Sequence, residues 1–208
     1  MDNYEVRILR HGSITESEDG SYNLRSNISL ITGSKNILVN TGGAWESDIL
    51  SSLLTSSGFT SKTIDYVICT NNKSDHIGNL NLFTNSTHIV GHDIQKDQCF
   101  LNHKFCNEIP FEIDKKISVI PTPGRFMTDL SVIIDNGPND ITAIVGDMIF
   151  NEEEIRNNFE FNGWPIWDIE KLIKNRRKIL ERVHRIIPGR GKEFMVKDHI
   201  NLPIIRHS

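Results

Sequence analysis

Short apolar runs recur along the chain, and most of them end in glycine, proline, asparagine or aspartate. Alternation, or a short apolar run bounded by turn residues, is typical of a β-strand. The segments that we interpret as strands are residues 4–8, 28–31, 37–39, 65–69, 87–90, 117–120, 130–134, 141–145 and 186–187. Helical spacing predicts helices at about 45–56 and 167–183. Strands and helices therefore interleave in parts of the chain, which predicts an α/β fold.

Four other segments have less regular patterns. Residues 11–27 are polar and predict an exposed hairpin loop, whereas residues 94–107 show no clear period. Residues 151–163 are acidic and polar, which predicts a loop with a short helical turn. The basic run at 171–182 lies within the predicted helix 167–183, and we interpret it as a solvated face.

Length and composition favour one domain that spans residues 1–208. The chain has 208 residues, and its 38% hydrophobic content is enough for a core. No apolar stretch reaches the 18 residues of a membrane span, and we expect no signal peptide and a cytoplasmic, possibly also nuclear, protein. The net charge of −4 gives no support to broad RNA binding.

The chain has three cysteines. Cys69 lies in an apolar strand and is predicted to be a core residue. Cys99 and Cys106 could pair, although reduced thiols are favoured.

The predicted strand 65–69 delivers the most informative stretch of the chain, residues 68–80. Asp75 and His76 stand where this strand gives way to a predicted short helix at 76–83. The end of a strand before a helix is where α/β proteins place their chemistry. A purely structural interpretation is that Asp75 caps the helix and that His76 forms hydrogen bonds at the sheet edge. Other strand ends expected at the same edge are residues 40–43, 123–125, 146–147 and 188–191.

Six motifs carry a resemblance to a known family: Asn40-Thr-Gly-Gly-Ala-Trp45, Ser74-Asp-His-Ile-Gly-Asn-Leu80, Thr122-Pro-Gly124, Asp129-Leu-Ser-Val132, Val145-Gly-Asp147 and Ile187-Pro-Gly189. In order and spacing they resemble the metallo-β-lactamase superfamily, and within it the family of metallo-β-lactamase domain-containing protein 1, over roughly residues 4–197. The resemblance implies an αββα sandwich of two mixed β-sheets flanked by helices. It also implies a hydrolase with two zinc ions, and an endoribonuclease of the histone pre-mRNA processing type as the specific activity.

The metal ligands of the superfamily are only partly present in this chain. The resemblance places the three histidines of the first zinc on Asn71, Lys73 and Arg125. It places the ligands of the second zinc on Asp75, His76 and Arg190, with Asp147 bridging the two ions. A strand-end aspartate of the family also falls on Asn40. Four histidine ligands are therefore replaced, while Asp75, His76 and Asp147 remain as vestigial metal-site residues.

The replacements oppose zinc binding on chemical grounds. Zinc takes imidazole, thiolate or carboxylate ligands, and an arginine side chain has no acceptor. Lys73 would first have to lose a proton, at a cost of about 4–5 kcal/mol at pH 7. A cation held ~4 Å from a divalent metal is repelled by roughly 8 kcal/mol at an effective dielectric constant of ~20. We therefore expect no metal at the first position and no cofactor overall; a single residual metal would use Asp75, His76 and Asp147.

The sequence thus favours a metallo-β-lactamase-fold pseudoenzyme with no catalytic residues, which acts as a binding or dimerisation module. The resemblance implies a homodimer or a heterodimer with an active paralogue. One alternative is a metal-dependent hydrolase or endoribonuclease with a single metal, for which RNA would be the partner. Another is an anion-binding pocket at the replaced ligand positions Asn71, Lys73, Arg125 and Arg190. In the leading interpretation we expect Arg125 or Arg190 to lie within hydrogen-bond reach of Asp75 or Asp147.

Overall fold

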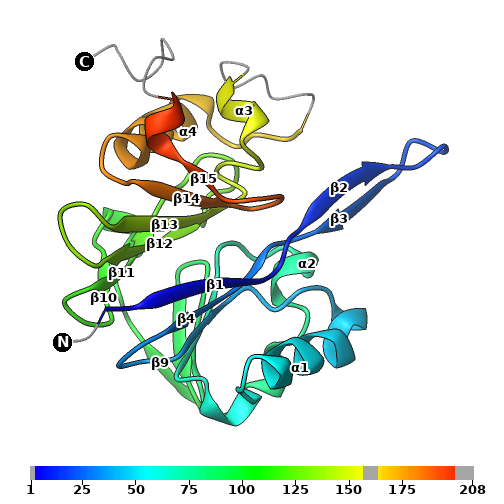
Figure 1. Cartoon of the computed structure of the whole chain (residues 1–208), viewed down its shortest axis with the longest axis vertical. Helices are drawn as coiled ribbons and strands as arrows, with labels where there is room; N and C mark the ends of the chain where they lie inside the picture. Colours follow the sequence, from blue (N-terminus) through cyan, green and yellow to red (C-terminus); the bar gives the residue numbers. More distant parts are fainter. Residues whose placement is uncertain (1–2, 157–163, 200–208) are drawn as a thin grey trace. The chain divides into compact units, whose positions relative to one another are not determined.

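The structure is a computed structural model that describes residues 3–156 and 164–199. The chain divides into two compact units, residues 1–104 and 105–208, and each unit contains one large mixed sheet (Figure 1). The predicted fold class, α/β with two mixed sheets and flanking helices, is confirmed. Whether the units act as a single domain stays a prediction. No helix in the described ranges is long and apolar enough to cross a membrane.

The N-terminal unit is built on a seven-stranded sheet with the order β1-β4-β5-β6-β7-β8-β9. Its strands are β1 (Glu5–Arg10), β4 (Ile28–Thr32), β5 (Ile37–Val39), β6 (Tyr66–Cys69), β7 (Thr87–Val90), β8 (Asp93–Lys96) and β9 (Cys99–Leu101). The three central strands β5, β6 and β7 are parallel, and the outer pairs are antiparallel. Helix α1 (Ser47–Ser56) crosses over between β5 and β6 and buries Leu50 and Leu54 in the core of this unit. The parallel centre brings the ends of β5 and β6 to one edge, where the predicted site begins.

The exposed hairpin loop predicted at residues 11–27 is confirmed. It contains the hairpin β2 (Ser13–Glu16) and β3 (Tyr22–Arg25), which forms a separate two-stranded sheet (Figure 1). Other local features of the N-terminal unit were not predicted. The segment without a clear period holds β8, β9 and a 3₁₀ turn, η4 (Phe105–Asn107), which begins the other unit. The predicted helix 76–83 is instead a short helix, α2 (Ser74–Ile77), followed by a 3₁₀ turn, η3 (Leu80–Leu82). The helix stops because the Gly78 amide donates to the Gly42 carbonyl, outside the helix.

The C-terminal unit is built on a six-stranded sheet with the order β10-β11-β12-β13-β14-β15. Its strands are β10 (Phe111–Glu112), β11 (Ile117–Pro121), β12 (Leu130–Asp135), β13 (Ile141–Gly146), β14 (Arg185–Pro188) and β15 (Phe194–Met195). Only β13 and β14 pair in parallel, and the helices α3 (Glu153–Arg156) and α4 (Ile169–Leu180) lie in the connection between them. The two-residue strands β10 and β15 were not predicted, because so short a segment shows no periodicity.

Helix α4 is the helix predicted at 167–183, shortened at both ends. It begins after Asp168, whose side chain accepts a hydrogen bond from the Lys171 amide at 3.0 Å, as an N-cap does. Its apolar face packs against β12, β13 and β14 through Leu172, Ile179 and Leu180. The prediction that the basic run is solvated is wrong at one position, because Arg176 is fully buried.

Candidate functional site

A chain of hydrogen bonds holds Asp75 and His76 in the N-terminal unit. The Asn71 side-chain oxygen accepts from the Lys73 amide at 2.9 Å, and the Asn71 amide nitrogen lies 3.2 Å from His76 Nε2. The other ring nitrogen, His76 Nδ1, lies 3.1 Å from Asp75 Oδ1. Because the Asn71 nitrogen can only donate, His76 Nε2 is the acceptor and Nδ1 carries the proton that goes to Asp75. The ring nitrogen that could bind a metal is therefore occupied by an amide.

Backbone contacts fix the same segment. The His76 carbonyl accepts hydrogen bonds from the Thr41 amide at 2.7 Å and from the Thr41 hydroxyl at 3.0 Å. The prediction that His76 forms hydrogen bonds at the sheet edge is confirmed. The prediction that Asp75 caps the helix is wrong: α2 begins at Ser74 with Lys73 in the N-cap position, so that Asp75 lies inside the first turn. Lys73 itself is exposed.

Asn40, at the end of β5, joins two strand ends of this unit. Its backbone has φ = +64°, a left-handed conformation that asparagine tolerates better than most residues. Its side-chain oxygen accepts from the Thr70 amide at 3.0 Å, while its amide nitrogen donates to the Asn27 carbonyl at 3.0 Å. An aspartate could accept the first bond but could not donate the second. The replacement at this position is therefore used structurally.

In the C-terminal unit, Asp147 directly follows β13 and pairs with an arginine. Arg190 Nη2 lies 3.2 Å from Asp147 Oδ2, and both side chains are buried. The backbone after β14 sets this distance, since the Arg190 amide donates to the Phe150 carbonyl and the Gly189 amide to the Ile149 carbonyl. A Cβ on Gly189 would lie 2.5 Å from Asp147 Oδ1, so this close approach requires glycine. The prediction that Arg125 or Arg190 reaches Asp75 or Asp147 is confirmed for Arg190 and Asp147.

Arg125, in the loop after β11, is the second buried arginine of the predicted site. Its Nε donates to the Asp147 backbone carbonyl at 2.6 Å, and its guanidinium carbon lies 3.8 Å from the centre of the Phe150 ring. The Arg190 guanidinium carbon lies 5.3 Å from the same ring. Both distances are within the range of cation–π attraction. The loop is held by α4, because the Asn175 side chain donates to the Pro123 carbonyl and the Asp168 amide to the Gly124 carbonyl.

Glu154 and Arg176 belong to this cluster, although the sequence analysis missed both. Glu154 Oε1 lies 2.6 Å from Arg125 Nη2, and Glu154 Oε2 lies 2.6 Å from Arg176 Nη2. Glu154 Oε2 also accepts from the Phe150 amide at 2.9 Å. Burial lowers the pKa of Arg176 to about 10, against the opposite effect of Glu154, so Arg176 stays charged at pH 7. One buried carboxylate thus bridges two buried guanidinium groups.

A signal for Arg176 was present in the sequence. The apolar face of α4 has Leu172 and then Ile179 and Leu180, and position 176 falls between them at helical spacing. An arginine at such a position must be buried with a partner. The partner could not be identified from the sequence, because Glu154 lies among acidic neighbours that look alike.

We expect Arg190→Met to lower the free energy of unfolding by about 2–4 kcal/mol, because it removes the cation beside the buried Asp147 carboxylate. Adding Asp147→Asn to this variant should recover part of the loss, since a neutral amide costs less to bury. Urea denaturation of the parent, both single variants and the double variant gives the coupling energy. Purely additive effects would show that the two side chains do not stabilise each other.

These residues do not fit the two zinc ions that the sequence resemblance implies. In the N-terminal unit His76 Nε2 accepts from Asn71, and in the C-terminal unit a guanidinium lies against Asp147 Oδ2. Neither asparagine nitrogen nor arginine supplies a lone pair to zinc. Within residues 3–156 and 164–199, no three histidine, cysteine, aspartate or glutamate side chains form a group that could hold a metal.

The cysteines lie outside both clusters. Cys69 is buried in β6, as predicted, and burial raises the pKa of its thiol. Cys99 and Cys106 are exposed and form no disulfide. Neither half of the predicted site therefore includes a thiolate ligand among the described residues.

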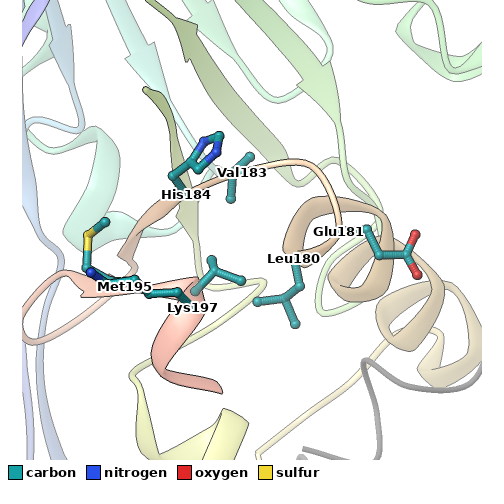
Figure 2. A pocket seen from close by; sticks show the side chains of 7 residues that line it. Leu180, Glu181, Val183, His184, Met195 and Lys197 are labelled. Carbon is teal, nitrogen blue, oxygen red and sulfur yellow. The ribbon is translucent and has the colours of Figure 1, made fainter. Parts of the chain in front are cut away.

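A cavity of about 410 Å³ lies elsewhere in the C-terminal unit, between the end of α4 and β15 (Figure 2). Leu180, Val183 and Val196 make it largely apolar, and His184 and Lys197 also line it. None of the residues predicted to form the site lines this cavity.

Comparison with known proteins agrees with the motifs. A model of the metallo-beta-lactamase superfamily matches residues 22–110. Metallo-beta-lactamase domain-containing protein 1 of Xenopus laevis is 29% identical over 200 residues, covering 94% of this chain and 83% of that protein. The Rattus norvegicus protein of the same name is 30% identical over 164 residues, covering 77% of this chain. The chain covers 63% of the rat protein, less than two thirds of its length.

Solved structures show the same likeness at the level of fold. A metallo-beta-lactamase-like protein from Thermotoga maritima superposes with a TM-score of 0.67 at 18% identity, covering 93% of this chain and 100% of that one. AidC, a dizinc quorum-quenching lactonase, superposes with a TM-score of 0.57 at 18% identity, covering 81% of this chain and 74% of AidC. At such identities the likeness concerns fold and carries no information about substrate.

Proposed function

We propose that this chain is a non-catalytic member of the metallo-β-lactamase superfamily that has replaced the dizinc centre with internal hydrogen bonds and ion pairs. The observation that carries the proposal is the Arg190–Asp147 pair, at 3.2 Å between buried side chains. A metal-bound hydroxide is the nucleophile that such a centre would generate near pH 7. A cation held against Asp147, the position that the resemblance gives as bridging, opposes the binding of the ions that would form it.

The replaced positions support the same proposal from the other unit. Asn71 makes a hydrogen bond with both of its side-chain groups, one to the Lys73 amide and one to His76. A side chain that only occupied the volume of the replaced histidine would not need to form both of these hydrogen bonds. The surviving histidine is thus integrated into a polar network that rigidifies the segment. We infer that the frame is retained for binding rather than for hydrolysis.

An anion-binding pocket at the arginines is a second candidate. Among the described residues, Arg125 Nη1 is buried and has no hydrogen-bond partner. Three arginines meet two carboxylates in this cluster, so its charge is net positive. A crystal soaked in inorganic phosphate tests this candidate: density beside Arg125 Nη1 would support it, and no density at a saturating concentration would count against it.

The single-metal alternative, a hydrolase or endoribonuclease of the histone pre-mRNA processing type, rests on the resemblance to relatives. It would require Asp75, His76 and Asp147 to give up the contacts described above. Dimerisation, with itself or with an active paralogue, is likewise part of the proposal. Sedimentation equilibrium of the purified chain measures the first kind of assembly, and a strictly monomeric chain would leave only the second.

We expect a strong chelator to leave the melting temperature of the parent unchanged. A ligand that binds only the folded state stabilises it by about 2.7 kcal/mol at a hundredfold excess over its dissociation constant. Removing such a ligand would therefore lower the melting temperature by several degrees. Differential scanning calorimetry with and without excess EDTA makes the comparison, and a drop on chelation would contradict the proposed loss of metal.

A further inference from the structure

A polar and aromatic cleft of about 410 Å³ lies in the N-terminal unit, beside the start of α2. The hairpin β2–β3 supplies Ser21, Tyr22 and Asn23; the turn after β5 supplies Trp45; α2 supplies Ser74 and Asp75. Tyr22 is 48% exposed and Trp45 is 73% exposed, so both aromatic side chains are accessible at this cleft. The volume lies within the ~300–1,000 Å³ of small-molecule sites.

The turn that carries Trp45 is fixed against the segment that carries Asp75. The Asn79 side chain donates to the carbonyls of Thr41 and Gly43, at 2.7 and 2.8 Å. The Gly78 amide donates to the Gly42 carbonyl at 2.8 Å, and a Cβ on Gly78 would lie within 2.3 Å of this turn's backbone. The two segments therefore keep one relative position, as a preformed site requires.

Trp45 and the hairpin are held in the same frame. A Cβ on Gly43 would lie 2.7 Å from the Trp45 ring, so the indole lies close against this glycine while most of the side chain remains exposed. At the base of the hairpin, the Ser26 hydroxyl donates to the Asp75 carbonyl. The hairpin and the turn after β5 are thus both held against α2 and the two residues that follow it.

The hydrogen-bond chain from Asn71 through His76 orients the Asp75 carboxylate. His76 Nδ1–H donates to Asp75 Oδ1 at 3.1 Å, and Asn71 holds the ring in this tautomer. This places a carboxylate of fixed orientation at the edge of a cleft bordered by two aromatic rings. None of the eight lining residues is basic.

We propose that this cleft binds a small organic cation bearing a methylated ammonium group, with Tyr22 and Trp45 as aromatic contacts and Asp75 as the counter-charge. The faces of tryptophan and tyrosine attract cations, and recognition of methylated ammonium groups by aromatic side chains is an established use of this attraction. Among the residues that line the cleft, an anionic ligand would meet one carboxylate and no basic side chain. The proposal rests on the proposed function, because a divalent ion on Asp75 would remove the negative charge.

The test is an NMR titration of the ¹⁵N-labelled full chain with choline, followed at the Trp45 indole and the Ser74 amide. We expect saturable shifts at both positions. The neutral isostere 3,3-dimethylbutan-1-ol should bind about tenfold more weakly, because it lacks the positive charge. A peptide that carries trimethyllysine is titrated in parallel, so that the two arms separate a free metabolite from a modified protein as the source of the ammonium group.

Single-residue variants test whether the cation binds at this cleft. Trp45→Ala and Asp75→Asn should each weaken binding by about tenfold, read from the Ser74 amide. Trp167→Ala is the matched control, because Trp167 is also an exposed tryptophan, 49% accessible, but lies in the other unit; its affinity should equal that of the parent. Equal binding of the neutral isostere, no saturable shift with either cation, or an unchanged affinity in Trp45→Ala would each overturn the proposal.

A zinc titration of the same sample separates this inference from the proposed function. Stoichiometric zinc binding at Asp75 and His76 would refute the loss of metal, whatever choline does. If neither zinc nor the cations bind, the loss of metal stands and only the ligand assignment fails.

Discussion

Replacing Glu154 with alanine should lower the free energy of unfolding by about 3–5 kcal/mol. The change removes the carboxylate that contacts both Arg125 and Arg176, each at 2.6 Å, and leaves two buried guanidinium groups without this partner. It also removes the acceptor of the Phe150 amide. Urea denaturation, with the midpoint and the slope fitted separately, measures the loss.

Glu153→Ala is the matched control for this prediction. Glu153 is the preceding residue of the same short helix but is exposed, so its loss should change stability by no more than about 0.5 kcal/mol. A triple variant, Arg125→Met, Glu154→Leu and Arg176→Met, should recover part of the stability because no buried charge is left uncompensated. If Glu154→Ala were as stable as Glu153→Ala, the cluster would not hold the C-terminal unit together.

We also expect zinc binding to be recovered when histidine is placed at all four replaced ligand positions. The variant carries Asn71→His, Lys73→His, Arg125→His and Arg190→His. It removes the amide on His76 Nε2 and the guanidinium on Asp147 Oδ2, and supplies four imidazoles. We expect its zinc affinity to exceed that of the parent by more than the ~10–100-fold that outer-shell changes alone produce. Isothermal titration calorimetry measures both proteins.

Two controls accompany the restored variant. Because Arg125→His removes a partner of Glu154, a circular dichroism melt first establishes that the variant is folded at the titration temperature. Adding Asp147→Ala should then abolish most of the recovered affinity, since Asp147 is the bridging carboxylate in the proposed arrangement. A folded variant with parental affinity would show that histidines at these four positions are not sufficient for zinc binding.

The apolar patterns identified most of the sheet but not its edges. The core strands β5, β6, β12 and β13 are short buried runs bounded by turn residues, and their bounds agree with the prediction to within a residue. The polar composition of residues 11–27 predicted an exposed hairpin, but its strands β2 and β3 bury little, so the hydrophobic pattern did not give their bounds. The two-residue strands β10 and β15 depend on pairing with neighbours rather than on their own sequence.

For the candidate site, the sequence identified several of the residues that take part but not most of the side chains that contact them. The motifs located Asp75, His76 and Asp147. Charge considerations predicted that an arginine of the site would pair with one of its aspartates, and the observed pair is Arg190 with Asp147. The role of Glu154 was hidden because its segment reads as a polar loop, and burial is a property of the tertiary structure. The amide network from Asn71 to Asp75 was also unpredicted, since a hydrogen bond between residues five apart depends on how the turn between them folds.

The central claim, that this chain has given up zinc, is tested most directly by the metal content of the purified parent. The protein is incubated with excess zinc, freed of unbound metal by gel filtration, and analysed by inductively coupled plasma mass spectrometry alongside the four-histidine variant. We predict zinc well below one equivalent in the parent and at least one equivalent in the variant. One or more equivalents of tightly held zinc in the parent, lost on Asp75→Asn or Asp147→Asn, would contradict the account.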